Sequence, residues 1–425
     1  MKGSGLAVAL ASLAILTGAG CTPSVNPASA PATTGSAATT VPTPPPAAAE
    51  PTTSTSVLAT PQPIATFQPV AAADLRWDQA ADLGPVMSLG GGFLFGDTYV
   101  VYGTDADNRS TVWTSGDGVS WTGTVLADVV AACPAAEPYP EALIGGGATD
   151  GPRIVLVGIQ FQVGGPGCNT TSAVAWTSTD GREWTRSKPF ANGNPHAVWP
   201  VEGGWEAALW NGSGEPETLW SSPDGLTWNQ STTPVAAAST TVTLSGGGDG
   251  MRFMILQNEG NGDQGVVDDL RAGESRIRRS ADGVTWQDIA WDFNAGHDTT
   301  SLGLPAQPPP AGPTPPWLVL ADHGDDPQAI WISTDLETWQ VAAFPIARMR
   351  DLAVTRYGFI AGGGGTGCGD GGQCDPQPAK QFLSADGIHW EPLASSLVAS
   401  LVLDGPAGVL AIGVANTGSI WKLRA

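Results

Sequence analysis

Short apolar runs alternate with polar, glycine-containing turns from residue 66 onward, and one pattern of this kind recurs six times. In each copy an apolar run leads into Ser-x-Asp-Gly or a close variant, and after two further residues a Trp opens the next run, as in "VWTSGDGVSWTG". Glycine accepts the positive φ that a tight hairpin requires, so Asp-Gly between two such runs is a strong hairpin signal. We therefore predict a pair of antiparallel β-strands around every copy.

The polar residues of this repeat turn have a structural explanation. Ser and Asp side chains bond the backbone amides of their own turn, and a Trp ring covers apolar surface beneath it. The fifth copy departs from the pattern because Leu336 replaces its glycine. We interpret the turns as scaffold rather than as nucleophile and base. The residues with this role are Asp117, Asp180, Asp224, Asp282, Asp335, Asp386, Trp121, Trp184, Trp228, Trp286, Trp339 and Trp390.

The spacing of the turns predicts the architecture. Successive turn aspartates lie 44 to 63 residues apart, a period that suits four-stranded propeller blades, and two further apolar runs precede each turn. After Trp390 three more runs follow without a turn, whereas the run around Trp77 stands alone at the start. We predict an all-β, seven-bladed propeller of four-stranded antiparallel blades, closed by the N-terminal strand; six blades are the alternative.

The six turns resemble the Asp-box repeat of the sialidase-like (BNR) superfamily of β-propellers, over residues 66–425, although these copies are one residue shorter between Asp and Gly. The resemblance implies that the first strand of each blade lines a central channel and that the turns lie away from the ligand face. The catalytic set of sialidases is not carried over. The only arginines between Asp74 and Asp117 are Arg76 and Arg109, and neither stands in the "RIP"-like phrase that holds the first arginine of sialidases. Tyr357 is expected to begin a second strand instead of lining the channel.

The first 65 residues have a different composition. Lys2, an apolar run over 6–16 and small residues predict an export signal over 1–20, which is too short to span a membrane as a mature helix. Cys21 resembles the lipidated cysteine of a bacterial lipoprotein, and 21–65 is a Pro/Thr/Ala-rich tether predicted to be disordered. We expect a chain anchored by lipid to the outer face of the bacterial cell membrane, or secreted if Cys21 is not lipidated.

Four more cysteines suit an oxidising exterior. Cys368 and Cys374 stand close together in a glycine-rich segment, which leaves Cys133 and Cys168 as the second disulfide among three formal pairings. Zinc is the competing interpretation, but no histidine neighbours these cysteines.

The net charge is −22, from 18 basic and 40 acidic residues. Such a chain repels phosphate backbones, so nucleic acid is not expected as a partner. An acidic surface resists aggregation, and we expect a monomer.

Residues that open the predicted first strands are expected to surround the channel mouth. These candidate ligand residues are Glu141, His196, Asp298, Arg348, Arg350 and Asp351. Grouped charges there suit a sugar acid, a peptide terminus or calcium. Asp322, Asp325 and Asp326 form a weak calcium candidate because no complete ligand pattern is present, and no other cofactor is expected.

These observations favour a non-catalytic binding or scaffold module for a protein, a peptide or a cell-wall glycan. The alternative is a sialidase-like exo-glycoside hydrolase that uses an acid pair such as Glu141 or Asp298 with Asp351. A structural protein without a ligand is the third class.

Overall fold

The structure is a computed structural model of the chain. It describes residues 67–127, 129–130, 139–161, 171–211, 217–231, 240–246, 252–258, 275–282, 285–289, 298–301, 317–322, 329–333, 337–343, 345, 349–368, 374–394, 397, 399–413 and 417–425. Within these ranges the chain is β-structure apart from one 3-10 turn, η1 (Ala72–Asp74). Over the same ranges, no helix has the length and apolarity that a membrane crossing requires. The export signal, the tether and Asp335 lie outside the described residues.

Seven four-stranded antiparallel sheets make up the described chain, as the seven-blade prediction requires. Blades one to three are β2 (Val86–Phe95), β3 (Thr98–Asp105), β4 (Ser110–Ser115), β5 (Thr122–Ala127); β8 (Ala142–Thr149), β9 (Ile154–Phe161), β10 (Thr171–Ser178), β11 (Thr185–Arg186); and β12 (Asn194–Val201), β13 (Gly204–Trp210), β14 (Thr218–Ser222), β15 (Asn229–Gln230). A two-stranded ribbon of β6 (Val129–Val130) and β7 (Tyr139–Pro140) separates blades one and two.

The remaining blades repeat this order. Blades four to seven are β16 (Thr240–Gly246), β17 (Arg252–Asn258), β18 (Ser275–Ser280), β19 (Gln287–Asp288); β20 (Asp298–Ser301), β21 (Trp317–Asp322), β22 (Ala329–Ser333), β23 (Gln340–Ala343); β24 (Met349–Thr355), β25 (Gly358–Cys368), β26 (Cys374–Ser384), β27 (Glu391–Pro392); and β28 (Leu401–Gly405), β29 (Gly408–Ile412), β30 (Ser419–Arg424) with β1 (Arg76–Asp82).

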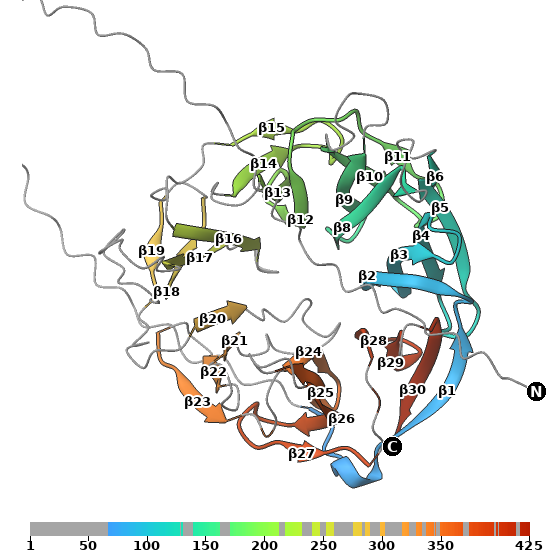
Figure 1. Cartoon of the computed structure of the whole chain (residues 1–425), viewed down its shortest axis with the longest axis vertical. Coiled ribbons are helices and arrows are strands. Elements are labelled where there is room, and N and C mark those ends of the chain that lie inside the picture. The colour runs from blue at the N-terminus through green and yellow to red at the C-terminus, as the bar shows by residue number, and fades with distance from the viewer. Residues whose placement is uncertain are drawn as a thin grey trace, which may run out of the picture. The chain divides into compact units, whose positions relative to one another are not determined.

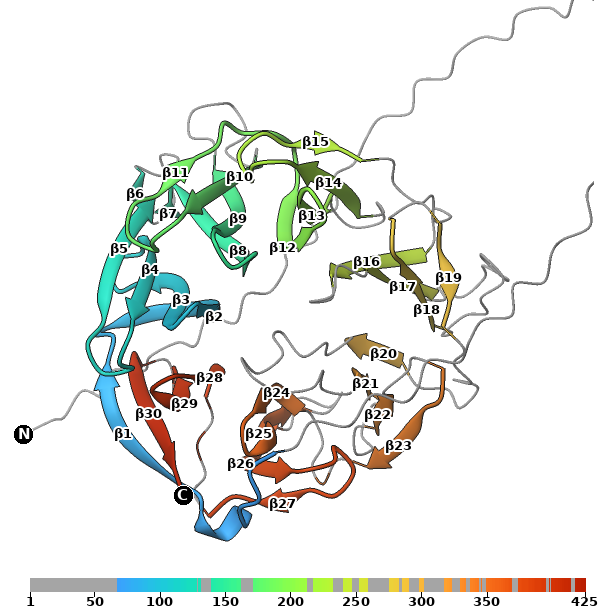
Figure 2. The same ribbon diagram turned by 180° about the vertical axis from the view of Figure 1, so that it is seen from behind.

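The blades stand in a ring with their first strands innermost (Figures 1 and 2). Strand β2 lies beside β8 and β28, β12 lies beside β8 and β16, and β24 lies beside β28. Four antiparallel strands return the chain to the end of the ring at which each blade began, so all first strands run the same way. We call the end with the second-to-third strand loops and blade connections the loop face, and the other end the repeat-turn face.

Close approach of the inner strands explains their glycines. A Cβ at Gly145 in β8 would lie 2.2 Å from the carbonyl oxygen of Pro195 in β12, and a Cβ at Gly146 would lie 2.8 Å from that of His196. Only glycine permits this backbone contact. Gly145 and Gly146 therefore mark where blades two and three touch.

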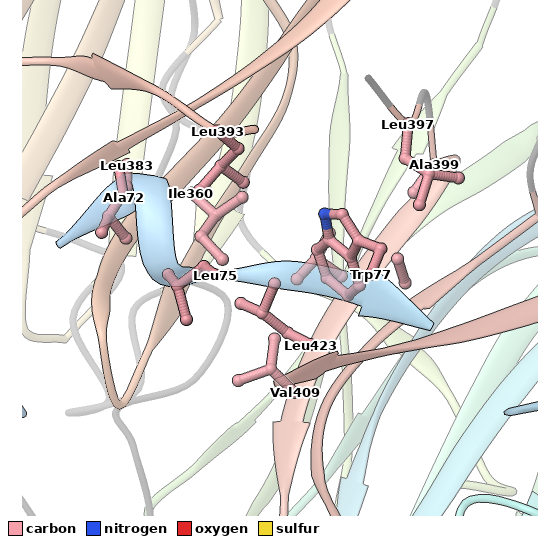
Figure 3. Close-up of a cluster of buried hydrophobic side chains, with 12 residues drawn as sticks. Ala72, Leu75, Trp77, Ile360, Leu383, Leu393, Leu397, Ala399, Val409 and Leu423 are labelled. Carbon is pink, nitrogen blue, oxygen red and sulfur yellow. The ribbon is translucent and has the colours of Figure 1, made fainter. Parts of the chain in front are cut away.

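The ring closes through β1, which pairs antiparallel with β30 from Arg76 opposite Arg424 to Asp82 opposite Ser419. The N-terminal strand is thus the outer strand of the seventh blade, as predicted. Trp77 and Leu75 are buried against Leu423 and Val409 of blade seven and Ile360 of blade six (Figure 3). The start of the folded chain therefore joins the last two blades.

The repeat turns form the expected hydrogen bonds. In the first turn the Ser115 hydroxyl donates to Asp117 Oδ1 at 3.0 Å, and the Gly118 N–H donates to Ser115 Oγ at 2.9 Å. Asp117 Oδ1 also accepts the N–H groups of Val119 and Ser120 at 2.8 and 2.6 Å. Each turn aspartate for which both amide bonds are described, Asp117, Asp180, Asp224 and Asp386, uses one oxygen in this way.

The turn glycines also dock one blade on the previous one. Gly225 of blade three has φ +77° and lies so close to blade two that an added Cβ would be 2.6 Å from Val155 Cγ2. Gly118 of blade one packs in the same way on Leu410 of blade seven. Leu336 lies outside the described residues.

The turn tryptophans are buried to different extents. Trp228 is buried, but Trp121, Trp184, Trp286, Trp339 and Trp390 are only partly buried. These rings stand beside the short fourth strands at the rim of the ring, where less chain covers them. Three of them, Trp184, Trp228 and Trp390, donate from Nε1 to the carbonyl of the turn glycine at 2.9 to 3.2 Å.

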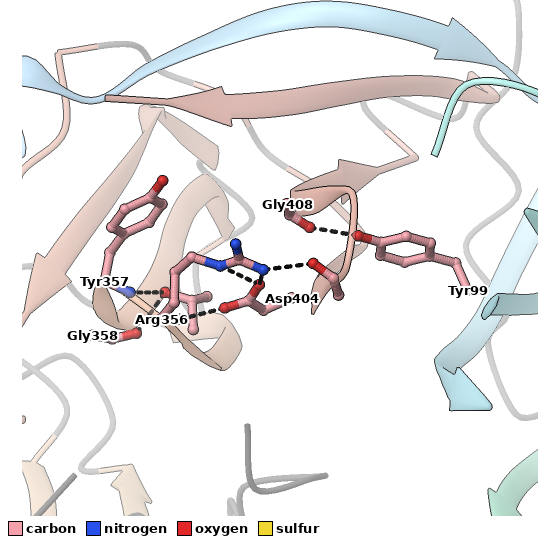
Figure 4. Close-up of polar contacts among 8 residues, drawn as sticks. Tyr99, Arg356, Tyr357, Gly358, Asp404 and Gly408 are labelled. Atoms are coloured by element: carbon pink, nitrogen blue, oxygen red, sulfur yellow. Dashed lines mark hydrogen bonds and ion pairs between the residues drawn. The ribbon is translucent and has the colours of Figure 1, made fainter. Parts of the chain in front are cut away.

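Ion pairs connect neighbouring blades on the repeat-turn face. Arg252 of β17 forms a bidentate pair with Glu206 of β13 at 2.5 and 2.7 Å, and both side chains are nearly buried. Arg356, in the turn between β24 and β25, binds Asp404 of β28 at 2.6 Å (Figure 4). The Tyr99 hydroxyl donates to the Gly408 carbonyl at 2.7 Å. Burial and the Asp404 charge raise the pKa of Tyr99 to about 12.

Removing the buried Trp77 side chain of the closing strand tests this architecture. We expect Trp77→Ala to lower the free energy of unfolding by about 3–5 kcal/mol, because the variant leaves a cavity between blades six and seven. Urea denaturation followed by fluorescence measures the change. Asp78→Ala is the matched control, because its ion pair with Arg424 is exposed and contributes less than about 1 kcal/mol. Equal losses in the two variants would contradict the closing role of Trp77.

The lowered pKa of a turn aspartate predicts that the free energy of unfolding depends on pH in the acid range. Burial raises the pKa of Asp386, but hydrogen bonds from the His389 side chain and the His389 and Ile388 amides outweigh it and lower the pKa to about 2. An unfolded Asp titrates near about 3.9, so this carboxylate stabilises the fold above about pH 4 and loses its contribution as the pH falls towards about 2.

We expect Asp386→Asn to be less stable than the natural chain at pH 7, by roughly 1 kcal/mol, because the amide keeps an acceptor but loses the charge. The difference should shrink as the pH falls from about 4 towards 2, measured as urea midpoints across that range. Asp97→Asn, at an exposed position in the β2–β3 turn, controls for the loss of a surface charge. A difference that does not change with pH would show that the charge of Asp386 contributes nothing.

Candidate functional site

The inner strands are irregular where they begin, at the loop face. Register shifts fall between Val86 and Ser88 in β2, between Pro195 and Ala197 in β12 and between Met349 and Asp351 in β24. The extra residues are Met87, His196 and Arg350. A bulge re-aims its side chain and interrupts pairing, and bulges are common beside binding sites. Two of the predicted ligand residues, His196 and Arg350, thus occupy bulges at the inner rim.

His196 has a buried acidic partner. Its Nε2 lies 3.4 Å from Oε1 of Glu217, which directly precedes β14, and the Glu217 side chain is 8% exposed against 35% for His196. A carboxylate buried to this extent needs a charged or hydrogen-bonding partner. Glu217 was not among the candidates from the sequence, because it opens a third strand, and only the folded blade brings it to the first strand.

Glu141 also lies in an ion pair. It precedes β8 by one residue, and its Oε1 lies 2.8 Å from Nη1 of Arg186 in the outer strand β11. The Arg186 guanidinium stacks over the Trp176 ring, 5.5 Å from its centroid. Arg186 was likewise missed, since its position after a repeat turn gives no sign that it contacts the loop face. The pair directs Glu141 along its own blade.

The other acidic candidates are placed by the backbone. Asp298 opens β20 and is the register partner of Asp322, the last residue of β21. Asp351 follows Arg350 in β24. Arg348, Asp325 and Asp326 lie outside the described residues. In the part of the chain that the structure describes, no group of three or more His, Cys, Asp or Glu residues is arranged to hold a metal ion.

The cysteine positions are described in part. Cys368 ends β25 and Cys374 begins β26, and the register pairs their Cα atoms across the hairpin. Directly opposed residues in antiparallel strands have Cα atoms about 4.5–5.5 Å apart, within the range that a disulfide requires. Cys21, Cys133 and Cys168 lie outside the described residues.

Tyr99, Tyr102 and Tyr357 lie in the second strand of blade one or on the repeat-turn face, whereas Tyr139 lies two residues before the candidate Glu141. Tyr99 and Tyr102 are buried in β3, the second strand of blade one, and burial raises the pKa of Tyr102 to about 12. Tyr357 lies in the β24–β25 turn on the repeat-turn face, one residue before the strand it was expected to begin. For Tyr139 the structure describes only the backbone, in β7.

Comparison with known proteins finds no matching family model and no match among curated proteins. Similar solved structures include the β-propeller domain of Cps50 (Swd1) from Myceliophteria thermophila, with 11% identity, a TM-score of 0.46 and coverage of 82% of this chain and 99% of that one. The phage phi92 endosialidase has 10% identity, a TM-score of 0.40 and coverage of 79% and 74%. The Aleuria aurantia lectin has 11% identity, a TM-score of 0.38 and coverage of 72% and 96%. Likeness at this level assigns neither a family nor an activity.

Proposed function

We propose that this chain is an extracytoplasmic β-propeller lipoprotein that acts as a non-catalytic binding or scaffold module for a protein, a peptide or a glycan. In this proposal the leader over 1–20 is removed, Cys21 carries lipid, and 21–65 is the tether. The propeller belongs to the Asp-box superfamily, and its loop face contacts the partner. Without lipid on Cys21 the same module would be secreted.

The observation that carries the proposal is the attachment of the first described residues to the repeat-turn face. Phe67 packs edge-on against Phe359 with ring centroids 5.3 Å apart, and the Gln68 N–H donates to the Arg356 carbonyl at 2.8 Å. Both partners lie at or beside the β24–β25 turn. The described chain therefore enters the ring on the repeat-turn face, and this attachment leaves the loop face uncovered.

The loop face offers a contact surface. Met87, the bulged residue of β2, is 57% exposed although it is a large apolar side chain. The loop face also carries the partly exposed His196 of the pair with Glu217. An exposed apolar group beside polar groups is the usual composition of a transient protein contact.

The hydrolase alternative needs a tyrosine nucleophile or two opposed carboxylates at the loop face. Of the described side chains, Tyr99 and Tyr102 are buried and Tyr357 lies in a turn of the repeat-turn face. Glu141 and Glu217 each form an ion pair. These observations favour binding without turnover.

A matched pair of variants tests the proposed surface. Met87 on the loop face and Val119 in the first repeat turn are both exposed apolar residues, at 57% and 54%. We expect the full chain to be retained by cell-wall material or by a membrane protein of the producing bacterium. Met87→Glu should weaken retention about tenfold, the effect of one lost interface contact of about 1.4 kcal/mol, and Val119→Glu should not.

Co-sedimentation with insoluble wall material and pull-down from solubilised membranes measure retention, and fluorogenic glycosides measure turnover by the same preparation. Equal retention of both variants would exclude Met87 from the contact surface. Turnover of a glycoside that is lost on Glu217→Gln would replace the binding module by the hydrolase.

We also propose that Cys368 and Cys374 form a disulfide that closes the β25–β26 hairpin. Non-reducing digestion and mass spectrometry of the exported chain should recover the two cysteines in one linked peptide. The double variant Cys368→Ser/Cys374→Ser should lower the melting temperature only slightly, since the closed loop is short. Two free thiols in the exported chain would refute the pairing.

A further inference from the structure

A groove of about 600 Å³ lies between blades two and three, and none of the predicted ligand residues of the inner rim lines it. It is lined by Ser172, Pro189, Phe190, Ala191, Asn192, Asn211, Thr218, Trp220 and Gln230. Its residues belong to the loop-face ends of β10, β14 and β15 or to the connections that follow β11 and β13. The volume falls within the range of about 300–1,000 Å³ that is typical of small-molecule sites.

The wall on the side of blade two is held by backbone bonds. After β11 the chain continues alongside β10, where the Phe190 N–H donates to the Ala173 carbonyl at 3.0 Å and the Ala173 N–H donates to the Ala191 carbonyl at 2.8 Å. The Phe190 ring then stacks on Trp228 with centroids 5.3 Å apart and meets Trp220 at 5.5 Å. The aromatic floor is therefore preorganised by both blades.

The polar wall on the side of blade three is preorganised as well. The Thr218 hydroxyl accepts hydrogen bonds from Trp220 Nε1 at 3.2 Å and from Asn211 Nδ2 at 3.3 Å. Gly193 has φ +138° and lies so close that an added Cβ would be 3.0 Å from Asn211 Oδ1. Only a residue without a side chain lets the connection pass beside this amide.

The chemistry of the lining selects the class of ligand. The exposed carboxamides of Asn192 and Gln230 each carry donors and an acceptor, and the Asn211 carboxamide and the Thr218 hydroxyl hold each other beside them. None of the described lining residues is charged, whereas the chain as a whole has a net charge of −22. Sugar hydroxyls also donate and accept, and the apolar face of a pyranose ring fits against an aromatic ring. We infer that this groove binds a neutral saccharide.

This inference rests on the proposed binding function and assigns it a ligand class and a place. The groove differs from the predicted channel-mouth site, where grouped charges suit a sugar acid, a peptide terminus or calcium. The described lining contains no cation, so an anionic sugar would exchange the hydration of its carboxylate for neutral amide donors alone. Neutral and anionic sugars therefore distinguish the two sites.

The test is calorimetric titration of the full chain with neutral trisaccharides of glucose, mannose or N-acetylglucosamine, with sialyllactose as the anionic probe. Gln230→Ala and Asn192→Ala remove exposed lining amides without touching the core. Each should weaken binding of the neutral sugar about three- to tenfold, as expected for one lost hydrogen bond. Asn229→Ala is the matched control, since Asn229 is equally exposed, adjoins Gln230 and does not line the groove.

Binding of a neutral trisaccharide that weakens in both lining variants, but not in Asn229→Ala, would support the inference. If all variants bind alike, or if only sialyllactose binds, the inference is overturned while the proposed binding function stands. If none of these sugars binds the natural chain, the groove is not a site for such sugars. The proposed function then fails only if the natural chain is also not retained by wall material or by membrane proteins.

Discussion

Backbone pairing between β1 and β30 is the constraint on which the rest of the structure depends. The last blade of a ring is four-stranded, like the others, only when an outer strand is added to it, and here that strand comes from the start of the described chain. Because Leu75 and Trp77 also pack on blades six and seven, closure joins the first described residues to the last two blades. It thereby fixes the face on which the described chain begins.

The repeat turns also stabilise the ring, through hydrogen bonds within each turn and contacts between neighbouring blades. In the first, second, third and sixth turns the Ser hydroxyl and one Asp oxygen accept amides of their own turn. The glycines of the first three turns pack on the preceding blade. These Ser and Asp residues therefore have a structural role, although their spacing of two residues suggests catalysis. In the proposed function the partner is bound instead on the loop face, where β2, β12 and β24 begin with bulges.

Variation among the blades is what makes a particular site. In the connection between blades two and three, residues 187–193 lie against β10 and place Phe190 beside two tryptophans. The inner rim is charged, whereas this groove is neutral, so one face presents two surfaces of different character. A scaffold of equal blades thus supports unequal binding surfaces, as expected when function resides in loops on a rigid frame.

The sequence by itself determined the all-β class, the four-stranded period and the place of the turns, because Asp-Gly hairpins and alternating apolar runs are set by local backbone geometry. It also indicated the closing strand, because the apolar run around Trp77 has no repeat turn of its own. It also identified His196 and Arg350 as rim residues from their positions at strand starts. Only the tertiary structure decided that Glu217 meets His196, that Glu141 turns to Arg186, and that Asn192, Asn211 and Gln230 share one groove. These contacts join residues from different strands or blades, and their distances depend on strand register and blade packing, which no local pattern encodes.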